Sequence, residues 1–501
     1  MADEAPAICR SAAERAKDIV PGLSRLSPRD AIRVAVMEQH GACRIMRSDA
    51  GFEGFPGIER PSCLSPIPLA NLIEPERESF MEKETGPLRD VPYMGVIYVV
   101  AEAAKLGYYG EHPDWCNLGQ GMPEVGPLPG APERVATVSI QPDDHAYGPV
   151  AGISELREAV ALLYNRQFRQ GMKSQYTAAN VAITAGGRLA LTRAVWALGK
   201  IRIGYFTPDY TAYEDLLGGI PSVTPVHIAL PVECGFAISP EKLAETIVQS
   251  ELHAALISNP CNPTGRVIRD EELNAWVSLA RRHRTALLLD EFYSHFIWNG
   301  PPPVSAAACV EDVNKDPVML LDGLTKNYRY PGWRVGWTLG PSDWIETITR
   351  SGSAIDGGAP RWLQRAAVPL VDSAHAWQET QAMRAAFRIK RDFMLDSLKR
   401  MGVLFPRDPE GTFYCWGSVA DLPPPLNDGF RFFREALKEK VITVPGEFFD
   451  VNPAKHRSDP PRLNPFVRFS FGAPMEVVRR GVARLTSMAA SAQIDHSKRL
   501  W

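Results

Sequence analysis

From about residue 150 to 345, short apolar runs alternate with segments whose apolar residues recur every three or four positions. The runs read VAIT (181 to 184), IGYFT (203 to 207), TPVHIAL (224 to 230), AALIS (254 to 258), ALLLD (286 to 290), VMLLD (318 to 322) and VGWTL (335 to 339). Between them, GRLALTRAVWALG and DEELNAWVSLARRHR have the spacing of helices with one buried face. This alternation predicts an α/β domain, in which a mostly parallel sheet is buried between two layers of helices.

The pattern changes after residue 345. A long helical segment, QETQAMRAAFRIKRDFMLDSLKRMG, is followed by the predicted strands TFYCWGSV, VITV and FVRFSF and by a last helix near MEVVRRGVARLTSMAA. This order predicts a smaller α+β domain. Because 501 residues exceed one ordinary domain, we expect three parts: an N-terminal extension (1 to 115) that also contributes a segment to the small domain, a large ligand-binding domain (116 to 345) and a C-terminal small domain (346 to 501).

Composition excludes several classes of function. A formal net charge of -3 gives no attraction to nucleic acid or to anionic membranes, so neither is expected as a partner. The eight cysteines form no Cys-x-x-Cys pair and lack the histidine spacing of a zinc site, so no metal is expected. Scattered cysteines, an acidic start without a signal-peptide pattern and the lack of a membrane-length apolar run predict a cytoplasmic protein.

Polar residues follow four of the predicted strands. Gly186, Gly187 and Arg188 come after VAIT, the run NPCNPTG (259 to 265) comes after AALIS, Asp290 ends ALLLD, and Lys326 follows VMLLD. Each has an ordinary explanation, namely a tight connection, a turn, a helix N-cap and a solvated lysine. Because the carboxyl ends of parallel strands meet at one edge of a sheet, we expect an anion-binding turn, an amide, a carboxylate and an amine to lie together there.

Arg468 lies in the short apolar run FVRFSF near the C-terminus. A permanently charged side chain is costly in a buried strand unless an anion accompanies it. An acidic residue in a structural salt bridge is the ordinary partner for such an arginine.

From about residue 115 to 488 the chain resembles the fold type I pyridoxal-phosphate enzymes, specifically the class I and II aminotransferases related to aspartate aminotransferase. The resemblance is carried by NPCNPTG, by the run DEFY that includes Asp290 and Tyr293, and by Lys326 with Arg334 eight residues later. It implies pyridoxal 5'-phosphate (PLP) as cofactor, held as a Schiff base on Lys326. It also implies amino-group transfer between an L-amino acid and a 2-oxo acid.

The resemblance assigns roles around the cofactor ring. Lys326 would form the Schiff base and later move the substrate proton, which requires a lowered pKa. Asp290 would face the pyridine nitrogen and keep it protonated, so that the ring accepts electrons. Asn262 and Tyr293 would form hydrogen bonds with the 3'-oxygen of the ring, and Tyr210 would stack on the ring.

The phosphate and the partner subunit have candidates as well. Gly186, Gly187 and Arg334 match phosphate-binding positions. Tyr147 matches a tyrosine that reaches the phosphate of the neighbouring subunit, which implies a homodimer with shared active sites. Two further candidates come from departures from the family pattern. Arg188 stands where a small or amide residue is usual, and Gly323 stands where many relatives have a serine that contacts the phosphate, so that this contact is either looser here or supplied by Thr325.

The resemblance also assigns the substrate-binding residues. Arg468 would hold the α-carboxylate through a two-pronged hydrogen bond, assisted by Asn262, and Gly121 would leave room for substrate beside the cofactor. The aromatic and apolar residues Tyr93, Met94 and Tyr98 could line the side-chain pocket, although a buried helix face explains them equally well.

Two other functions remain open at this point. The same constellation also serves a PLP-dependent lyase, cyclase or oxidase, because the protein decides the fate of a common carbanion. The remote alternative is a transcription regulator with an aminotransferase-like domain behind a DNA-binding module. Residues 1 to 110 argue against it, since they carry slightly more acid than base and show no helix-turn-helix followed by a basic recognition helix.

Overall fold

The computed structural model describes residues 93, 95–110 and 112–499, with side chains described as far as residue 494. These residues belong to one unit, Pro92–Trp501. Its centre is a seven-stranded sheet in the order β2-β8-β7-β6-β5-β3-β4. The strands are β2 (Val181–Thr184), β3 (Ile201–Thr207), β4 (Val223–Ala229), β5 (Ala254–Ser258), β6 (Ala286–Asp290), β7 (Val318–Gly323) and β8 (Gly336–Leu339). The seven predicted strands are therefore confirmed, with ends that differ by at most two residues.

Strand direction decides where the polar strand ends lie. β4, β3, β5, β6 and β7 are mutually parallel, and β8 is antiparallel to both of its neighbours, β7 and β2. Consequently β2 runs in the same direction as β7, and Thr184 and Gly323 both pair with Gly336. The carboxyl ends of six strands thus share one edge of the sheet, as the sequence pattern predicted.

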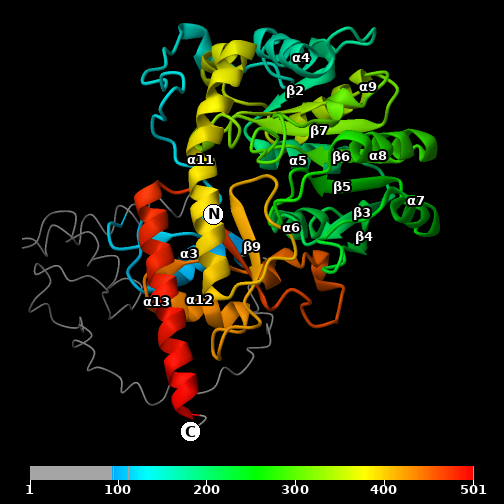
Figure 1. Ribbon diagram of the computed structural model, residues 1–501. Helices are drawn as coiled ribbons and strands as arrows, with labels where there is room; N and C mark the ends of the chain where they lie inside the picture. Colours follow the sequence, from blue (N-terminus) through cyan, green and yellow to red (C-terminus); the bar gives the residue numbers. More distant parts are fainter. Residues whose placement is uncertain (1–92, 94, 111, 500–501) are drawn as a thin grey trace, which may run out of the picture. The chain divides into compact units, whose positions relative to one another are not determined.

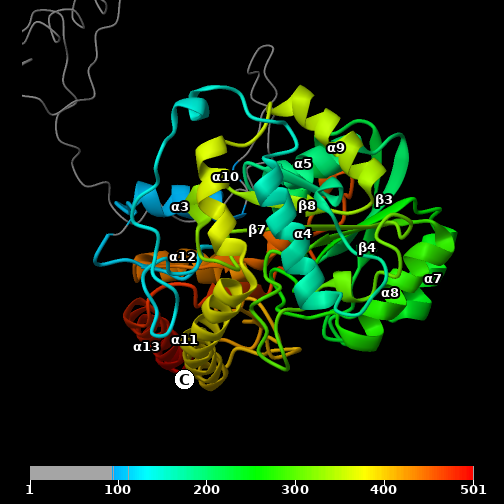
Figure 2. The same ribbon diagram turned by 90° about the horizontal axis from the view of Figure 1, so that it is seen from above.

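Helices cover both faces of this sheet, because its strands are buried on both sides. Leu287 and Leu289 of β6 belong to a core cluster that includes residues of α4 (Ser154–Phe168), α7 (Pro240–Gln249) and α8 (Asp270–His283). Leu288 points the other way, into a cluster with α5 (Gly187–Ala197), α6 (Ala212–Gly218) and α9 (Ser342–Ile355). Figure 2 shows α7 and α8 on one side of the β3 and β4 strands and α5 and α9 on the other.

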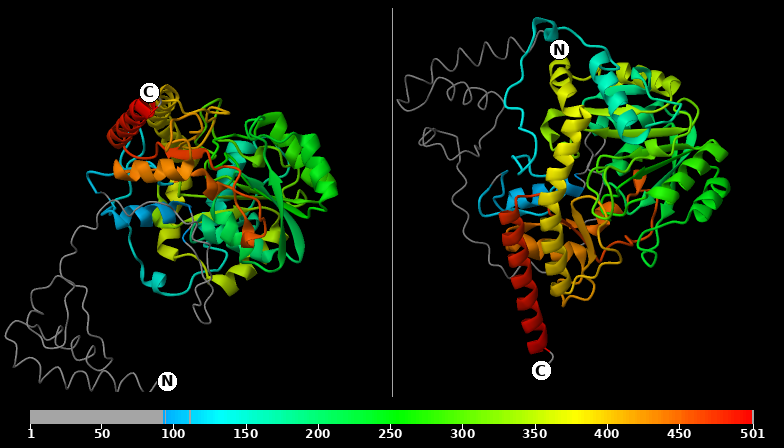
Figure 3. Two further views of the ribbon diagram at one scale, coloured as in Figure 1. Left: turned by 90° about the horizontal axis from the view of Figure 1, so that it is seen from below. Right: turned by 45° about the horizontal axis from the view of Figure 1, so that its top comes forward.

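A second, smaller group of strands lies beside long helices. β11 (Val444–Pro445), β12 (Phe466–Ser470) and β9 (Tyr414–Ser418) form a three-stranded antiparallel sheet, and β1 (Cys116–Asn117) pairs in parallel with β10 (Val441–Ile442). The accompanying helices are α3 (Gly95–Lys105), α10 (Arg361–Ala367), α11 (Ser373–Met401), α12 (Gly429–Lys438) and α13 (Met475–Arg499). The two longest, α11 and α13, run side by side (Figures 1 and 3).

Local sequence signals fix the ends of α11. The Asp372 carboxylate caps its first turn by accepting hydrogen bonds from the backbone N–H groups of Ala374 (2.9 Å) and His375 (3.3 Å). Gly402, with φ of 101°, ends the helix in the left-handed conformation that glycine adopts without strain. The predicted strand VITV is interrupted at Thr443, which separates β10 from β11.

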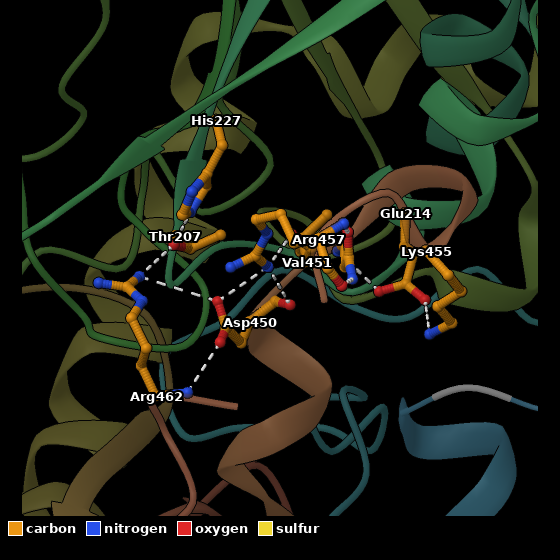
Figure 4. Close-up of polar contacts among 9 residues, drawn as sticks. Thr207, Glu214, His227, Asp450, Val451, Lys455, Arg457 and Arg462 are labelled. Carbon is orange, nitrogen blue, oxygen red and sulfur yellow. Dashed lines mark hydrogen bonds and ion pairs between the residues drawn. The ribbon is translucent and has the colours of Figure 1, made fainter. Parts of the chain in front are cut away.

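Residues 450 to 462 form a polar bridge to β3 and α6, in which the carboxylates of Asp450 and Glu214 are buried (Figure 4). The Asp450 carboxylate accepts hydrogen bonds from the Arg462 backbone N–H (2.9 Å) and the Arg457 guanidinium (3.1 Å). The Arg462 guanidinium donates to the Thr207 hydroxyl at the end of β3 (2.6 Å). On α6, Glu214 accepts from the Asn452 backbone N–H (2.9 Å) and forms an ion pair with Lys455. The bridge therefore anchors the segment between η9 (Gly446–Phe449) and β12 to β3 and α6.

Among the helices of the described residues, none is long and apolar enough to cross a membrane. Within residues 93 to 499 as described, no group of three or more histidine, cysteine or acidic side chains has the arrangement of a metal site. The expectations for residues 1 to 92, the comparison with DNA-binding modules included, lie outside the described residues, and the predicted domain boundaries stay predictions.

Candidate active site

A cavity of about 310 Å³ lies at the carboxyl edge of the large sheet. Eleven of the thirteen site residues predicted from the sequence line it: Gly121, Gly187, Arg188, Tyr210, Asn262, Asp290, Tyr293, Thr325, Lys326, Arg334 and Arg468. They come from the ends of β2, β3, β5, β6 and β7 and the segments that follow them, from the segment after β1, and from β12. Gly186 lies directly behind this lining, against Arg334, whereas Tyr147 is fully exposed elsewhere.

The turn between β2 and α5 forms the predicted anion cradle. Gly186 is the N-cap of α5, with φ of 91°, a conformation that L side chains rarely adopt. A Cβ atom at Gly186 would collide with the Arg334 guanidinium, and one at Gly187 would collide with the Phe292 ring. The glycines therefore allow the N-terminus of α5 and the guanidinium to approach each other closely. Backbone N–H groups, helix dipole and Arg334 are the elements of a phosphate site.

Lys326 lies three residues beyond the end of β7, and its ammonium nitrogen donates a hydrogen bond to the Gly121 carbonyl oxygen. Burial lowers the pKa of Lys326 to about 7, with help from the positive charges of Arg468 and Arg334 and against the attraction of Asp290. An amine with a pKa near 7 is substantially neutral at physiological pH, so it is able to attack a carbonyl and to accept a proton.

Asp290 ends the buried strand β6 and is itself buried. Its carboxylate accepts hydrogen bonds from the Tyr213 hydroxyl (2.9 Å) and the Phe292 backbone N–H (3.4 Å). Burial raises the pKa of Asp290 to about 6, although these two donors and Lys326 oppose the rise. A cationic ring nitrogen bound nearby would stabilise the carboxylate further, because opposite charges favour the ionised form.

Arg468 is buried in β12, as its apolar flanks predicted. Its guanidinium donates to the Asn262 side-chain oxygen (2.8 Å) and to the Gly119 carbonyl oxygen (2.7 Å), while its buried Nε atom has no partner. Among the described residues, no carboxylate forms an ion pair with Arg468. A structural salt bridge within the described part of the chain is therefore not what neutralises this charge, which favours a bound anion.

Tyr293 and Tyr210 enter the cavity from different strand ends. The Tyr293 hydroxyl lies 2.7 Å from the Tyr414 hydroxyl. Tyr210 follows the end of β3, and its backbone N–H donates to Asp209 (2.7 Å), a buried carboxylate that also binds Ser258. Burial raises the pKa of Asp209 to about 8. These contacts fix the loop that carries Tyr210.

Three groups in the cavity wall lack partners that a bound phosphate would supply. The buried Thr325 hydroxyl has no hydrogen-bond partner, and it stands close to the lysine, where the family resemblance expected a phosphate contact. In the described part of the chain, neither Arg188 nor Arg334 is paired with a carboxylate. The residues present therefore fit a dianionic phosphate.

Sequence reasoning missed several residues that support this site. Tyr213 lies three residues after Tyr210 and donates to Asp290, a contact that no spacing in the sequence indicated. Tyr414 belongs to the predicted strand TFYCWGSV, to which the sequence assigned no part in the site. Tyr98 does not line the cavity but packs on Phe430 and Phe448, Tyr93 is two-thirds exposed, and Met94 lies outside the described residues. Val96 and Ile97 of α3 line the cavity instead.

Known proteins that this chain resembles are aminotransferases. The family model "Aminotransferase class I and II" matches residues 113 to 485. Valine–pyruvate aminotransferase of Mycobacterium tuberculosis is 28% identical over 388 residues, which is 76% of this chain and 92% of that protein. Aspartate aminotransferase of Sulfurisphaera tokodaii is 25% identical over 377 residues, 74% of this chain and 88% of the relative.

Solved structures agree on the fold. Aspartate aminotransferase from Thermus thermophilus with maleate superposes with a TM-score of 0.66 at 23% identity, over 80% of this chain and 100% of that one. An aminotransferase from Mycobacterium tuberculosis gives the same TM-score at 26% identity, over 80% of this chain and 97% of the other.

Proposed function

Because the chain belongs to the class I and II aminotransferases and is therefore an enzyme that transfers groups, we propose that it moves an amino group between an L-amino acid and a 2-oxo acid, with PLP bound through Lys326. One observation carries the proposal: a lysine whose pKa is lowered shares a cavity with a buried carboxylate, an anion cradle and an arginine that lacks an acidic partner.

The residues fit PLP group by group. The cofactor supplies an aldehyde that condenses with amines and a pyridine ring that accepts electrons. Gly186, Gly187 and Arg334 would hold its phosphate, with Arg188 and the unpartnered Thr325 hydroxyl as additional donors.

Around the ring, Asp290 would keep the pyridine nitrogen protonated, and Tyr213 holds that carboxylate in place. Tyr210 would pack on the ring face, while Tyr293 and Asn262 would donate to the ring oxygen.

Lys326 would act a second time, as the group that moves the substrate proton. Burial lowers the pKa of this amine, so it would be able to take a proton from one substrate carbon and return it to another position. The Gly121 carbonyl, which accepts a hydrogen bond from the lysine, helps to hold the amine on the correct side.

Arg468 and Asn262 would bind the α-carboxylate. The guanidinium is already oriented by Asn262 and the Gly119 carbonyl, so little side-chain entropy is lost when a carboxylate binds. Gly121 leaves room at this point, because a Cβ atom there would lie 3.0 Å from the Tyr414 hydroxyl.

The cavity supports a preference for apolar substrate side chains. Val96, Ile97, Met122 and Leu191 contribute apolar surface to it. The cations that line it in the described part of the chain are Lys326, Arg188, Arg334 and Arg468. Each already has a role toward cofactor or α-carboxylate in this proposal, so none remains for a second carboxylate. We expect valine, leucine or methionine to react faster than aspartate or glutamate.

A homodimer with shared active sites is part of the proposal. Tyr147 is 100% exposed, and Ile140, a few residues earlier, is 57% exposed. The family resemblance has Tyr147 reach the phosphate of the second subunit, which requires that its side chain project from the surface of its own chain. Mixing Lys326→Ala and Tyr147→Ala proteins tests this: hybrid dimers should regain part of the activity, whereas monomers in sedimentation would contradict it.

We also infer a cytoplasmic location. Cys116, Cys234, Cys261, Cys309 and Cys415 are free thiols in the structure, as expected in a reducing compartment. Fractionation of the source cells tests this inference.

The decisive experiment incubates PLP-loaded protein with single amino acids. We expect the 2-oxo acid and the amino form of the cofactor in equal amounts, followed by return of the aldehyde form when a second 2-oxo acid is added. If ammonia, hydrogen peroxide or a cyclised product forms and no amino group reaches an acceptor, the lyase, oxidase or cyclase alternative replaces this proposal. Lys326→Ala is the control and should abolish the visible absorbance of the lysine-bound cofactor.

A further inference from the structure

Tyr414 touches three of the proposed functional groups at once. It begins β9 and is fully buried. Its hydroxyl lies 2.7 Å from the Tyr293 hydroxyl, and the Arg468 guanidinium carbon lies 4.1 Å from its ring centroid. On a third side it faces Gly121, whose added Cβ would be 3.0 Å from the Tyr414 hydroxyl. No role follows for Tyr414 from the sequence pattern or from the proposed reaction as described above.

The direction of the hydrogen bond between the two tyrosines follows from what Tyr293 must do. Two neutral hydroxyls at this distance form one hydrogen bond, and either of them could be the donor. If the Tyr293 hydrogen is used toward the ring oxygen of the cofactor, the same oxygen atom can only accept from Tyr414. The relay therefore has one consistent direction: Tyr414 donates to Tyr293, and Tyr293 donates to the cofactor.

The charge of Arg468 favours the same direction. Burial raises the pKa of both tyrosines, and the guanidinium opposes the rise for both. For Tyr414 it is the largest opposing cause, whereas for Tyr293 the contact with Tyr414 raises the pKa further, to well above the ordinary value. A cation held against the ring face withdraws electron density and makes the attached hydroxyl a better donor. Tyr414 is thus suited to donate and Tyr293 to accept.

We propose that Tyr414 is a positioning residue that orients and polarises the Tyr293 hydroxyl toward the cofactor ring, and that couples this hydroxyl to the substrate-binding Arg468. The inference rests on the proposed function, because it requires the cofactor between Asp290 and Tyr293. Hydrogen bonds in a chain strengthen one another, so the donation from Tyr414 makes Tyr293 a stronger donor.

A stronger donor at the ring oxygen stabilises its anionic form, which makes the lysine-bound cofactor easier to deprotonate. Removing the Tyr414 hydroxyl should therefore move the pH at which the visible absorbance titrates upward, by about 0.3 to 1 unit for one net hydrogen bond. The other charged or titratable groups that line the cavity stay in place: Arg188, Tyr210, Asp290, Tyr293, Lys326, Arg334 and Arg468.

The test is a pH titration of the visible absorbance of PLP-loaded wild type, Tyr414→Phe, Tyr293→Phe and the double variant. Phenylalanine at position 414 keeps the ring over which Arg468 lies, so α-carboxylate binding should change little. Both single variants should titrate at higher pH, and Tyr293→Phe should shift more. In the double variant the Tyr414→Phe change should add nothing, because a relay acts only through Tyr293. Tyr176→Phe, a buried tyrosine that does not line the cavity, is the matched control.

Two outcomes would overturn the inference while leaving the proposed function intact. One is a Tyr414→Phe titration that coincides with wild type. The other is a shift on Tyr414→Phe that is equally large in the wild-type and in the Tyr293→Phe background. Wild type that never develops the visible absorbance would instead refute the proposed function itself. If Tyr414→Phe does not fold, Gly121→Ala displaces the Tyr414 hydroxyl with both tyrosines retained and should shift the titration in the same upward direction; no shift would again overturn the relay.

Discussion

The lowered pKa of Lys326 can be measured directly in cofactor-free protein. Burial and the charges of Arg468 and Arg334 lower the pKa of this amine from 10.5 to about 7. Only the neutral amine attacks an aldehyde. At pH 7.5 an amine with a pKa of about 7 is about three-quarters neutral, whereas one with a pKa of 10.5 is neutral in about one molecule per thousand. Lys326 should therefore be several hundred-fold more available at this pH than an ordinary lysine.

The assay mixes cofactor-free protein with PLP and records the rise of visible absorbance across the pH range. The rate should rise to a plateau with a midpoint near pH 7. The rate with Nα-acetyl-lysine, measured in parallel as a model amine, should still be rising near pH 10. Lys326→Ala should give no specific phase. A protein profile that follows the model amine, without a midpoint near 7, would refute the reasoning.

Two variants test the sign of the electrostatic contributions. Arg468 lowers the pKa of Lys326, so Arg468→Gln should raise the midpoint, and Asp290 raises that pKa, so Asp290→Asn should lower it. Each shift should be roughly half to one and a half units, the size expected for one nearby charge in a partly buried site. Shifts in the same direction would show that general loosening of the cavity, rather than charge, controls the amine.

Three further predictions concern neighbouring elements. Tyr213→Phe removes a hydrogen-bond donor from Asp290, so the pKa of Asp290 should rise further. We expect kcat to fall about 5- to 30-fold and the acidic limb of its pH profile to move to higher pH. An unchanged profile would argue against this contact. Gly186→Ala should weaken PLP binding at least about tenfold in a fluorescence titration, because the added methyl group collides with Arg334 at a positive φ; wild-type affinity would contradict the cradle. Glu214→Gln should lower the free energy of unfolding by about 1 to 3 kcal/mol in denaturant titrations, because the buried carboxylate binds Asn452 and Lys455. The control is Glu346→Gln, which removes an exposed ion pair with Arg350 and should cost less than about 0.5 kcal/mol. Equal effects would show that the bridge in Figure 4 contributes little to stability.

The sequence alone determined the sheet and its chemistry. Strands buried on both faces must be apolar throughout, so runs such as AALIS and ALLLD identified β5 and β6 to the residue. Because parallel strands place their carboxyl ends together, the residues after them had to share one edge, and Gly187, Arg188, Asn262, Asp290 and Lys326 now line one cavity. The family resemblance, rather than the strand pattern, supplied other lining residues such as Gly121 and Arg468.

Only the tertiary structure decided which groups support that site. Tyr213 reaches Asp290 across 77 positions, and Tyr414 reaches Tyr293 across 121. Such contacts depend on how α6 and β9 pack against the large sheet, which local spacing does not encode. For the same reason the pocket residues proved to be Val96 and Ile97 rather than Tyr98, since the rotation of α3 decides which of its faces meets the cavity. Local periodicity specifies elements and their ends, but partners distant in the chain are chosen by packing alone.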